Sequence, residues 1–288
     1  MISYGIMQGR LTPSRERGIQ FFPFDNWQKE FFTAETLGLQ EIEWIFDYER
    51  YDENPIWTLS GREALREIIH RTGVIVYSVC FDYFMRRPFY KYQGNEQKER
   101  YQENLEMAYN VLDGLAEIGA QLLEVPMVDS SSVKTPKERD SAVEYIGRLA
   151  EYGAKKNLKI GLETDFAPGV FTSFLEEVHA DNVFANFDSG NSSGIGYLPE
   201  EEIPALGDRI CNVHIKDRVY HGTTVALGTG SADFDRVFKN LKKVGYHNSF
   251  ILQAARGRDG LEEETVRKQL DFVKGYIDKY RLQEEDAL

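Results

Sequence analysis

The chain has 288 residues and a formal net charge of −13, from 34 basic and 47 acidic side chains. This charge argues against a nucleic-acid partner, because non-specific affinity for a polyanion comes from neutralising its phosphates. The two cysteines, Cys80 and Cys211, lie in apolar runs and do not indicate a disulfide framework. No stretch of the sequence approaches the roughly 18 apolar residues of a membrane span. We therefore expect a soluble, cytoplasmic protein with no membrane partner.

Short apolar segments alternate with longer amphipathic segments along the whole chain, and no long linker separates them. The predicted strands are Ile2–Gln8, Glu41–Phe46, Val74–Phe81, Leu122–Met127, Lys159–Glu163, Val183–Asp188, Ile210–Ile215 and Ser249–Gln253. The predicted helices are Asn26–Leu37, Gly61–Arg71, Asn95–Ile118, Pro136–Lys156, Val170–His179, Pro199–Leu206, Phe234–Val244 and Leu261–Tyr280.

Strands that alternate with helices in this way indicate parallel βαβ units. Such units form either an open doubly wound sheet or a closed barrel. The count of eight strands and the chain length favour an α/β fold with a single (β/α)8 TIM barrel. We expect one domain over residues 1–288, in which residues 279–288 form a charged C-terminal tail.

Polar residues interrupt the last four predicted strands at their C-terminal ends, where barrel enzymes carry their chemistry. These residues are Glu163, Asp188, His214 and Gln253. Consecutive strands are neighbours in a barrel, so the four side chains would converge. Oxygen and nitrogen ligands of this kind suit Mn²⁺, Mg²⁺, Co²⁺ or Zn²⁺. Each residue also has a purely structural interpretation, such as a helix cap for Asp188. A purely structural explanation of the whole pattern would need four such interpretations, one for each strand end.

The chain resembles the xylose-isomerase-like TIM-barrel superfamily of sugar phosphate isomerases, 3-epimerases and inosose dehydratases. The resemblance extends over essentially the whole chain. The segments that carry it are Gly5–Leu11, Gly161–Glu163, Phe187–Asn191, His214–Asp217 and Gly228–Phe234. These motifs are specific for the superfamily and say little about the substrate.

The resemblance implies one divalent metal ion on Glu163, Asp188 and His214. The family's fourth ligand is a glutamate on strand eight, where this chain has Gln253. An amide oxygen can coordinate a metal ion, but an amide cannot exchange a proton near neutral pH. Gln253 therefore argues against an epimerase that works with two glutamates. It favours an isomerase, or a dehydratase, in which Glu163 removes the proton α to a carbonyl and an enediolate forms.

Five further residues are candidates for the site. Asp82, which ends the third predicted strand, is a candidate for a second acid or base, although it can equally cap a loop. Arg10, Lys216, Arg218 and Arg256 are candidates for contacts with a sugar or sugar phosphate. Glycine-rich loops after strand seven often bind phosphate in barrels, but the Gly228–Gly230 segment also occurs in family members that act on free sugars.

Other interpretations remain open at this point. Six aromatic residues between positions 81 and 92 can form a wall that stacks on a sugar or an interface between subunits. The chain can be an inosose-type dehydratase or a sugar-binding barrel without catalytic activity. An abasic-site endonuclease is disfavoured, because the second and third predicted strands contain no histidine. The resemblance also implies a homodimer or homotetramer.

Overall fold

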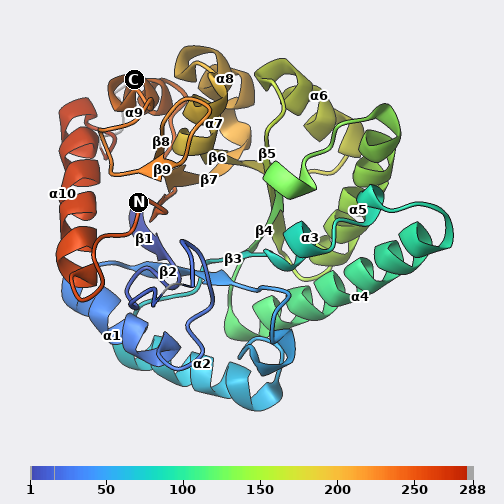
Figure 1. Ribbon diagram of the computed structural model, residues 1–288, viewed down its shortest axis with the longest axis horizontal. Helices are drawn as coiled ribbons and strands as arrows, with labels where there is room; N and C mark the ends of the chain where they lie inside the picture. The colour runs from blue at the N-terminus through green and yellow to red at the C-terminus, as the bar shows by residue number, and fades with distance from the viewer. Residues whose placement is uncertain (1, 16, 284–288) are drawn as a thin grey trace. The chain divides into compact units, whose positions relative to one another are not determined.

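The computed structural model describes residues 2–15 and 17–283 (Figure 1). Eight strands form a closed parallel barrel in the order β1-β10-β7-β6-β5-β4-β3-β2, which confirms the predicted (β/α)8 architecture. The barrel strands are β1 (Ser3–Met7), β2 (Glu41–Ile45), β3 (Ser78–Cys80), β4 (Leu122–Met127), β5 (Lys159–Thr164), β6 (Val183–Asp188), β7 (Ile210–Ile215) and β10 (Ser249–Leu252). Two short strands, β8 (Asp217–Arg218) and β9 (Thr224–Val225), form a separate antiparallel pair.

Ten α-helices lie in the described part of the chain. They are α1 (Trp27–Leu37), α2 (Leu59–Thr72), α3 (Tyr83–Arg86), α4 (Gly94–Ile118), α5 (Pro136–Ala154), α6 (Pro168–Val178), α7 (Ser189–Ile195), α8 (Pro199–Leu206), α9 (Phe234–Lys243) and α10 (Glu262–Tyr280). Among the described residues, no helix has both the length and the apolar character needed to cross a membrane. Residues 284–288 of the predicted tail lie outside the described residues.

The elements differ from the predicted ones in two respects. The third strand is shorter than Val74–Phe81, because its backbone pairs with the fourth strand only from Tyr77 onward. Helices α3 and α7 and the short strands β8 and β9 were not predicted. The α7 sequence, Ser-Gly-Asn-Ser-Ser-Gly-Ile, has low intrinsic helix propensity, so its helix depends on its cap and on packing.

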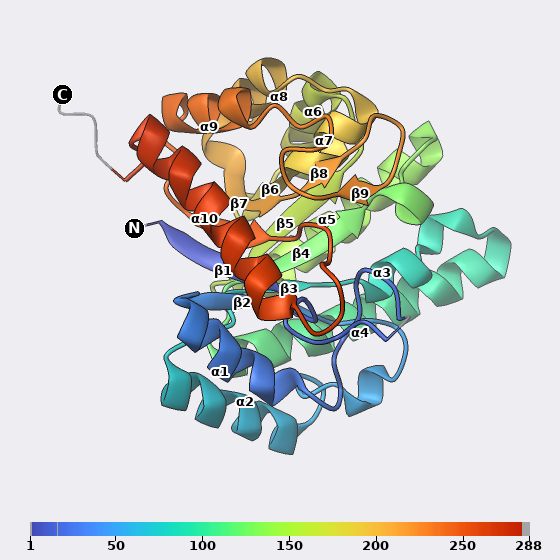
Figure 2. The ribbon, with the colours of Figure 1, turned by 60° about the vertical axis from the view of Figure 1, so that its left-hand side comes forward.

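The described chain forms two compact units, the first of which comprises residues 2–42, 167–169 and 185–283. In this unit β1 pairs with β10, β10 with β7, and β7 with β6. Helix α8 packs against α9, α9 against α10, and α10 against α1 (Figures 1 and 2). The ends of β6, β7 and β10 are thus fixed by parallel pairing.

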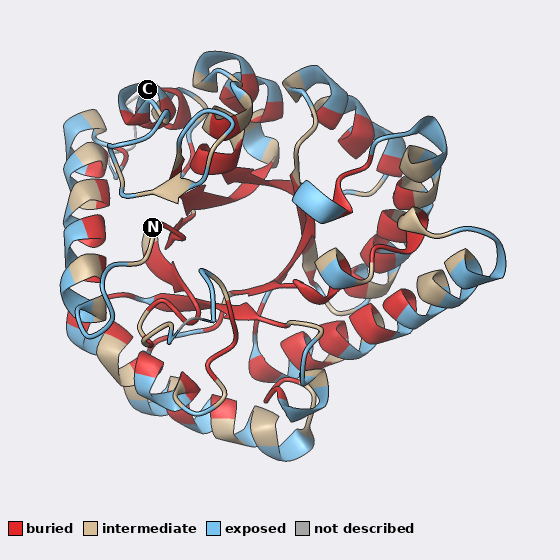
Figure 3. Cartoon of the chain, viewed as in Figure 1, coloured by how far each residue is buried: buried red, intermediate tan, exposed pale blue. Residues whose placement is uncertain are grey.

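The second unit comprises residues 43–166 and 170–184. Strands β3, β4 and β5 pair in parallel, and β2 pairs with β3. Helix α2 packs against α4, and α4 packs against α5. Every residue of β4 is buried, while the helices carry a buried stripe on one side and exposed residues on the other (Figure 3). This pattern is expected for parallel strands that are covered on both faces.

The aromatic residues that follow β3 form part of the core of the second unit. Phe81, Tyr83, Phe84, Phe89 and Tyr90 are each at most 4% exposed. The rings of Phe84 and Phe89 stack around a buried tyrosine of α5 at centroid distances of 5.5 and 5.0 Å. These five side chains therefore supply buried apolar area, and neither a sugar-stacking wall nor a subunit interface describes them.

A close approach of backbones occurs where α2 follows the loop at residues 55–56. A Cβ atom added to Gly61 would lie 2.4 Å from the backbone oxygen of Pro55. Gly147, in the middle of α5, has no atom within 4 Å of such a Cβ. Both glycines therefore lie in helices, but only Gly147 has room for a methyl group.

We expect Gly61→Ala to lower the free energy of unfolding by about 1–3 kcal/mol, since the backbone of Pro55 must move to admit a methyl group. Gly147→Ala is the matched control. It should leave the free energy of unfolding unchanged or raise it by up to about 1 kcal/mol, because alanine has the higher helix propensity. Urea denaturation of both variants measures the difference, and equal effects would contradict the close approach.

A buried carboxyl group joins α7 to α8. Glu202 is 6% exposed, and its Oε1 accepts a hydrogen bond of 3.0 Å from the Ser192 hydroxyl. Its Oε2 has no hydrogen-bond partner among the described residues. Burial raises the pKa of Glu202 from 4.5 to about 7, and the nearby charge of Asp188 adds to the increase. The fold therefore favours the protonated form of this side chain.

Because the pKa of Glu202 is raised in the folded state, its protonated side chain contributes fully to the free energy of unfolding below pH 4.5. This contribution is lost as the pH rises through about 7. Glu202→Gln removes this titration. We expect the difference in unfolding free energy, variant minus wild type, to increase by up to about 3 kcal/mol between pH 5 and pH 8. Urea denaturation at both pH values measures it. Glu201→Gln, at the exposed neighbouring position, is the control, and a pH-independent difference for Glu202→Gln would contradict the assignment.

Candidate functional site

Asp188 ends β6 and is also the N-cap of α7. Its Oδ1 accepts hydrogen bonds of 2.8 Å from the backbone N–H groups of Gly190 and Asn191. Its Oδ2 faces the other way and lies 3.2 Å from Nζ of Lys216 and 4.0 Å from Nδ1 of His214. The carboxylate is 2% exposed. Helix capping and a ligand role are thus compatible, because each uses a different oxygen atom.

His214 lies on β7 directly opposite Asp188 in the parallel register. The imidazole is fully buried, and its Nδ1 lies 3.1 Å from the side-chain nitrogen of Asn186. The two ends of an asparagine amide are assigned from the hydrogen-bond network. Which of the two groups donates here depends on the orientation of the amide and on the tautomer of the imidazole.

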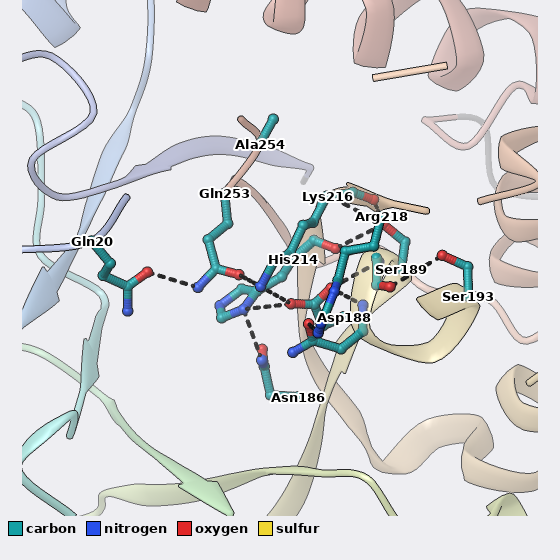
Figure 4. A network of polar contacts seen from close by, with 12 residues as sticks. Gln20, Asn186, Asp188, Ser189, Ser193, His214, Lys216, Arg218, Gln253 and Ala254 are labelled. Atoms are coloured by element: carbon teal, nitrogen blue, oxygen red, sulfur yellow. Dashed lines mark hydrogen bonds and ion pairs between the residues drawn. The ribbon is translucent and has the colours of Figure 1, made fainter. Parts of the chain in front are cut away.

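Lys216 and Gln253 lie side by side with Asp188 (Figure 4). The Lys216 ammonium group donates to Oδ2 of Asp188 at 3.2 Å and to Oε1 of Gln253 at 3.1 Å. The Gln253 amide nitrogen donates to Oε1 of Gln20, in the loop after β1, at 3.2 Å. Two oxygen atoms, one at the end of β6 and one directly after β10, therefore converge on one cationic group.

Gly190 permits this position of Lys216. A Cβ atom at Gly190 would lie 2.6 Å from Cγ of Lys216 and 2.9 Å from its backbone carbonyl carbon. The Ser189 hydroxyl also donates to the backbone oxygen of Lys216 at 2.7 Å. The first turn of α7 thus fixes both the backbone and the side chain of Lys216.

Glu163 and Asp82 belong to the second unit. Glu163 is the penultimate residue of β5 and is 5% exposed. Asp82 follows β3, is 9% exposed, and accepts a hydrogen bond of 3.3 Å from the Cys80 thiol. It is the N-cap residue of the short helix α3, without a side-chain hydrogen bond to that helix. Burial, together with the charge of Asp82, raises the pKa of the Cys80 thiol.

Arg10, in the loop after β1, and Arg256, in the loop after β10, donate hydrogen bonds to backbone carbonyl groups. Arg256 donates to the carbonyl oxygens of Gly9 at 2.7 Å, Thr12 at 3.0 Å and Ile19 at 2.8 Å. Arg10 donates to the carbonyl oxygens of Ala254 at 3.2 Å and of Ile19. Both guanidinium groups therefore fix the loop that carries Gln20.

Glu30 completes this arrangement from α1. Its two carboxylate oxygens accept hydrogen bonds from the backbone N–H of Gly9 at 2.9 Å, the backbone N–H of Leu11 at 3.2 Å and the Thr12 hydroxyl at 2.8 Å. Burial raises the pKa of Glu30 to about 7. Loop 9–20 is thus held from both sides, by Glu30 and by the two arginines.

The fourth predicted substrate contact, Arg218, also binds protein groups. Its Nη1 donates to the side-chain oxygen of Asn191 at 3.0 Å, and its Nη2 donates to the carbonyl oxygen of Gly222 at 3.1 Å. Of the four predicted cations, Lys216 is the one that contacts the side chains of Asp188 and Gln253 in the described first unit.

Several residues of the site were not predicted from the sequence. Asn186 had a usable signal, because it lies two residues before Asp188 and strand side chains alternate, so both face the same side. Buried Glu43 on β2 accepts a hydrogen bond of 2.6 Å from the Ser78 hydroxyl, and its alternation with Glu41 in Glu-Ile-Glu-Trp-Ile was visible. Gln20 and Glu30 had no local signal, since their roles depend on contacts with distant loops.

Curated relatives of this chain are epimerases. A putative L-ribulose-5-phosphate 3-epimerase of Haemophilus influenzae is 24% identical over 244 residues, which cover 79% of this chain and 83% of the relative. An L-ribulose-5-phosphate 3-epimerase of Escherichia coli is 25% identical over 274 residues, with 88% and 90% covered. Among solved structures, a D-allulose 3-epimerase from Methylomonas sp. has a TM-score of 0.73 at 18% identity and covers 96% of this chain and 98% of its own.

The family model for the xylose isomerase-like TIM barrel matches residues 31–276. The match spans most of the barrel and includes β5, β6, β7 and β10, with the four residues at their ends. The predicted family is therefore confirmed. This chain belongs to the xylose isomerase-like TIM-barrel family.

Proposed function

We propose that the protein is a divalent-metal-dependent epimerase or isomerase of keto sugars, which acts by removing the proton α to a carbonyl group. The observation that carries this proposal is the pairing of Asp188 with His214 at adjacent strand ends, both buried, with the second oxygen of Asp188 turned away from its helix cap. The names of the relatives, which are epimerases of sugars and sugar phosphates, support the same class of reaction.

The donor set fits a divalent metal ion. Glu163, Asp188 and His214 are buried and offer carboxylate and imidazole ligands, which Mn²⁺, Mg²⁺, Co²⁺ and Zn²⁺ accept. We propose that these three residues and Oε1 of Gln253 hold the ion. Metal binding then requires the Lys216 ammonium group to turn aside, and its side chain is 15% exposed, so it borders solvent. A bound ion would supply Lewis-acid stabilisation of the negative charge that develops on the substrate.

The residues of the chain would perform the proton transfer. Glu163 removes the proton from the carbon next to the carbonyl, which leaves an enediolate. Lys216 donates a hydrogen bond to a substrate oxygen and so balances the developing charge. Gln253 orients the substrate through its amide and transfers no proton. Asp82 remains the candidate for a second acid or base.

Gln253 bears on the choice between epimerisation and isomerisation. Epimerisation needs a proton removed from one face of the sugar and returned to the other, whereas isomerisation can proceed on one face with one base. The amide of Gln253 thus favours a one-base isomerisation, or a dehydration after the same first step, while the relatives' names favour 3-epimerisation. The carbon that acquires deuterium from D₂O distinguishes 3-epimerisation from isomerisation, and loss of water from the sugar identifies dehydration.

The test of the proposed function is proton exchange. With Mn²⁺ or Mg²⁺ present, we expect the protein to exchange the proton α to the carbonyl of a ketose into D₂O, as followed by NMR. Glu163→Gln should lower the exchange rate at least about 100-fold, which is the usual contribution of a general base.

Glu151→Gln, on the exposed surface of α5, is the matched control for that experiment and should keep the wild-type rate. Circular dichroism melting checks that both variants fold. Metal binding without exchange of any ketose would instead support a sugar-binding barrel without catalytic activity. Undiminished exchange by Glu163→Gln would exclude Glu163 as the base.

The fourth metal ligand can be tested by changing its charge. We expect Gln253→Glu to tighten Mn²⁺ binding about tenfold or more, because a carboxylate adds a negative charge to the ligand set. Gln253→Ala should weaken binding. Calorimetric titration of the metal-free protein measures both. Equal affinities in wild type, Gln253→Glu and Gln253→Ala would show that Gln253 is no ligand and serves only to link Gln20 to Lys216.

A further inference from the structure

We infer that the site takes an uncharged keto sugar and discriminates against the corresponding sugar phosphate. This inference rests on the proposed function and adds the substrate class to it. It follows from the contacts of the first unit, in which two backbone N–H groups of the glycine loop and the side chains of Lys216, Arg218 and Arg256 already bind groups of the protein itself.

The glycine loop after β7 binds an internal carboxylate. Asp217 is fully buried, and its two oxygens accept hydrogen bonds from the backbone N–H groups of Gly230 at 2.8 Å and Ala232 at 3.0 Å. A Cβ atom at Gly230 would lie 2.3 Å from Oδ1 of Asp217. The glycine is therefore needed for the close approach of Asp217, and the N–H groups that could form a phosphate nest are occupied.

The nearby helix N-termini carry acidic groups as well. Helix N-termini attract phosphate through free N–H groups and the helix dipole. In α7 and α9, Asp188 and Asp233 accept hydrogen bonds from these N–H groups. In α10, Glu262 accepts from the N–H of Gly260 at 2.8 Å. The first turns of α8 and α10 contain three glutamates each, Glu200, Glu201, Glu202, Glu262, Glu263 and Glu264.

Three cations near these loops are engaged too. Arg218 binds Asn191 and Gly222, and Arg256 binds three carbonyl groups of the first loop. Lys216 binds Asp188 and Gln253. A phosphate dianion that bound to these three cations would break such contacts, which leaves buried acceptors unsatisfied, and it would meet the acidic helix ends.

Two cations of the second unit that follow β3 are matched in the same way. Lys91 donates to the carbonyl oxygen of Ser132 and lies 3.5 Å from Oε1 of Glu138. Arg87 lies 3.3 Å from Oε1 of Glu103. Arg86 is exposed. Burial raises the pKa of the Asp47 carboxyl, and the positive charge of Arg86 lowers it.

The polar groups beside Lys216 suit hydroxyl groups. The amides of Gln253 and Gln20 each offer donors and an acceptor, and they already form a hydrogen-bonded pair at 3.2 Å. A neutral polyol can exchange hydrogen bonds with such groups without a net change of charge. The chemistry of this part of the site therefore matches a free ketose.

The test compares matched substrate pairs with the metal-loaded wild-type protein: L-ribulose with L-ribulose 5-phosphate, and D-ribulose with D-ribulose 5-phosphate. We expect kcat/KM for α-proton exchange to be at least about tenfold higher for the free ketose of the productive pair, a difference of about 1.4 kcal/mol. We also expect that 10 mM (about 10⁻² M) inorganic phosphate neither raises the melting temperature of the protein nor inhibits exchange.

A preference for the phosphorylated ketose would overturn the inference and leave the proposed function intact. Exchange of neither member of any pair by the metal-loaded protein would overturn the proposed function and the inference with it. Asp217→Ser provides a second measurement, because it frees the N–H groups of Gly230 and Ala232. If this variant folds, it should bind inorganic phosphate more tightly than the wild type, and unchanged binding would argue against Asp217 as the group that excludes phosphate.

Discussion

The site of the first unit depends on Asp188, because its two carboxylate oxygens make different contacts. One oxygen caps α7, a helix whose serine and glycine residues have little helix propensity of their own. The other oxygen fixes Lys216 and faces His214. Because α7 in turn holds Lys216 through Ser189 and Gly190, the cap and the charged cluster stabilise each other. A change at Asp188 would therefore disturb the helix and the cluster together.

The sequence predicted the barrel well, because its signals are local and repeated. Alternation of apolar strands with amphipathic helices fixes the fold class, and seven of the eight strands lie close to their predicted bounds. The positions of Asp188, His214 and Gln253 followed from one rule, that polar residues at the C-terminal ends of barrel strands belong to the site. The same rule, applied two residues earlier, would have found Asn186.

The roles of the arginines could not be predicted in this way. Arg10 and Arg256 stand next to the strand ends, as substrate-binding residues would, but they bind carbonyl groups of a loop that is distant in sequence. Asp217 belongs to the His214–Asp217 segment, and nothing in that segment indicates that its carboxylate is fully buried and binds the glycine loop. In both cases the partner is a backbone group, and a backbone group leaves no mark in the sequence.

The contacts between the loop after β10 and loop 9–20 have a consequence for biosynthesis. Arg256 and Asp259 hold the backbone of Gly9, Ser14 and Arg15, across a separation of as many as 247 residues. At about 5–20 residues per second, a ribosome needs on the order of tens of seconds to reach Arg256 and Asp259 after it has made loop 9–20. Until then loop 9–20 has its contacts with Glu30 but lacks those that Arg256 and Asp259 supply. A chain that ends before Arg256 would lack these later contacts, however much of the barrel precedes it.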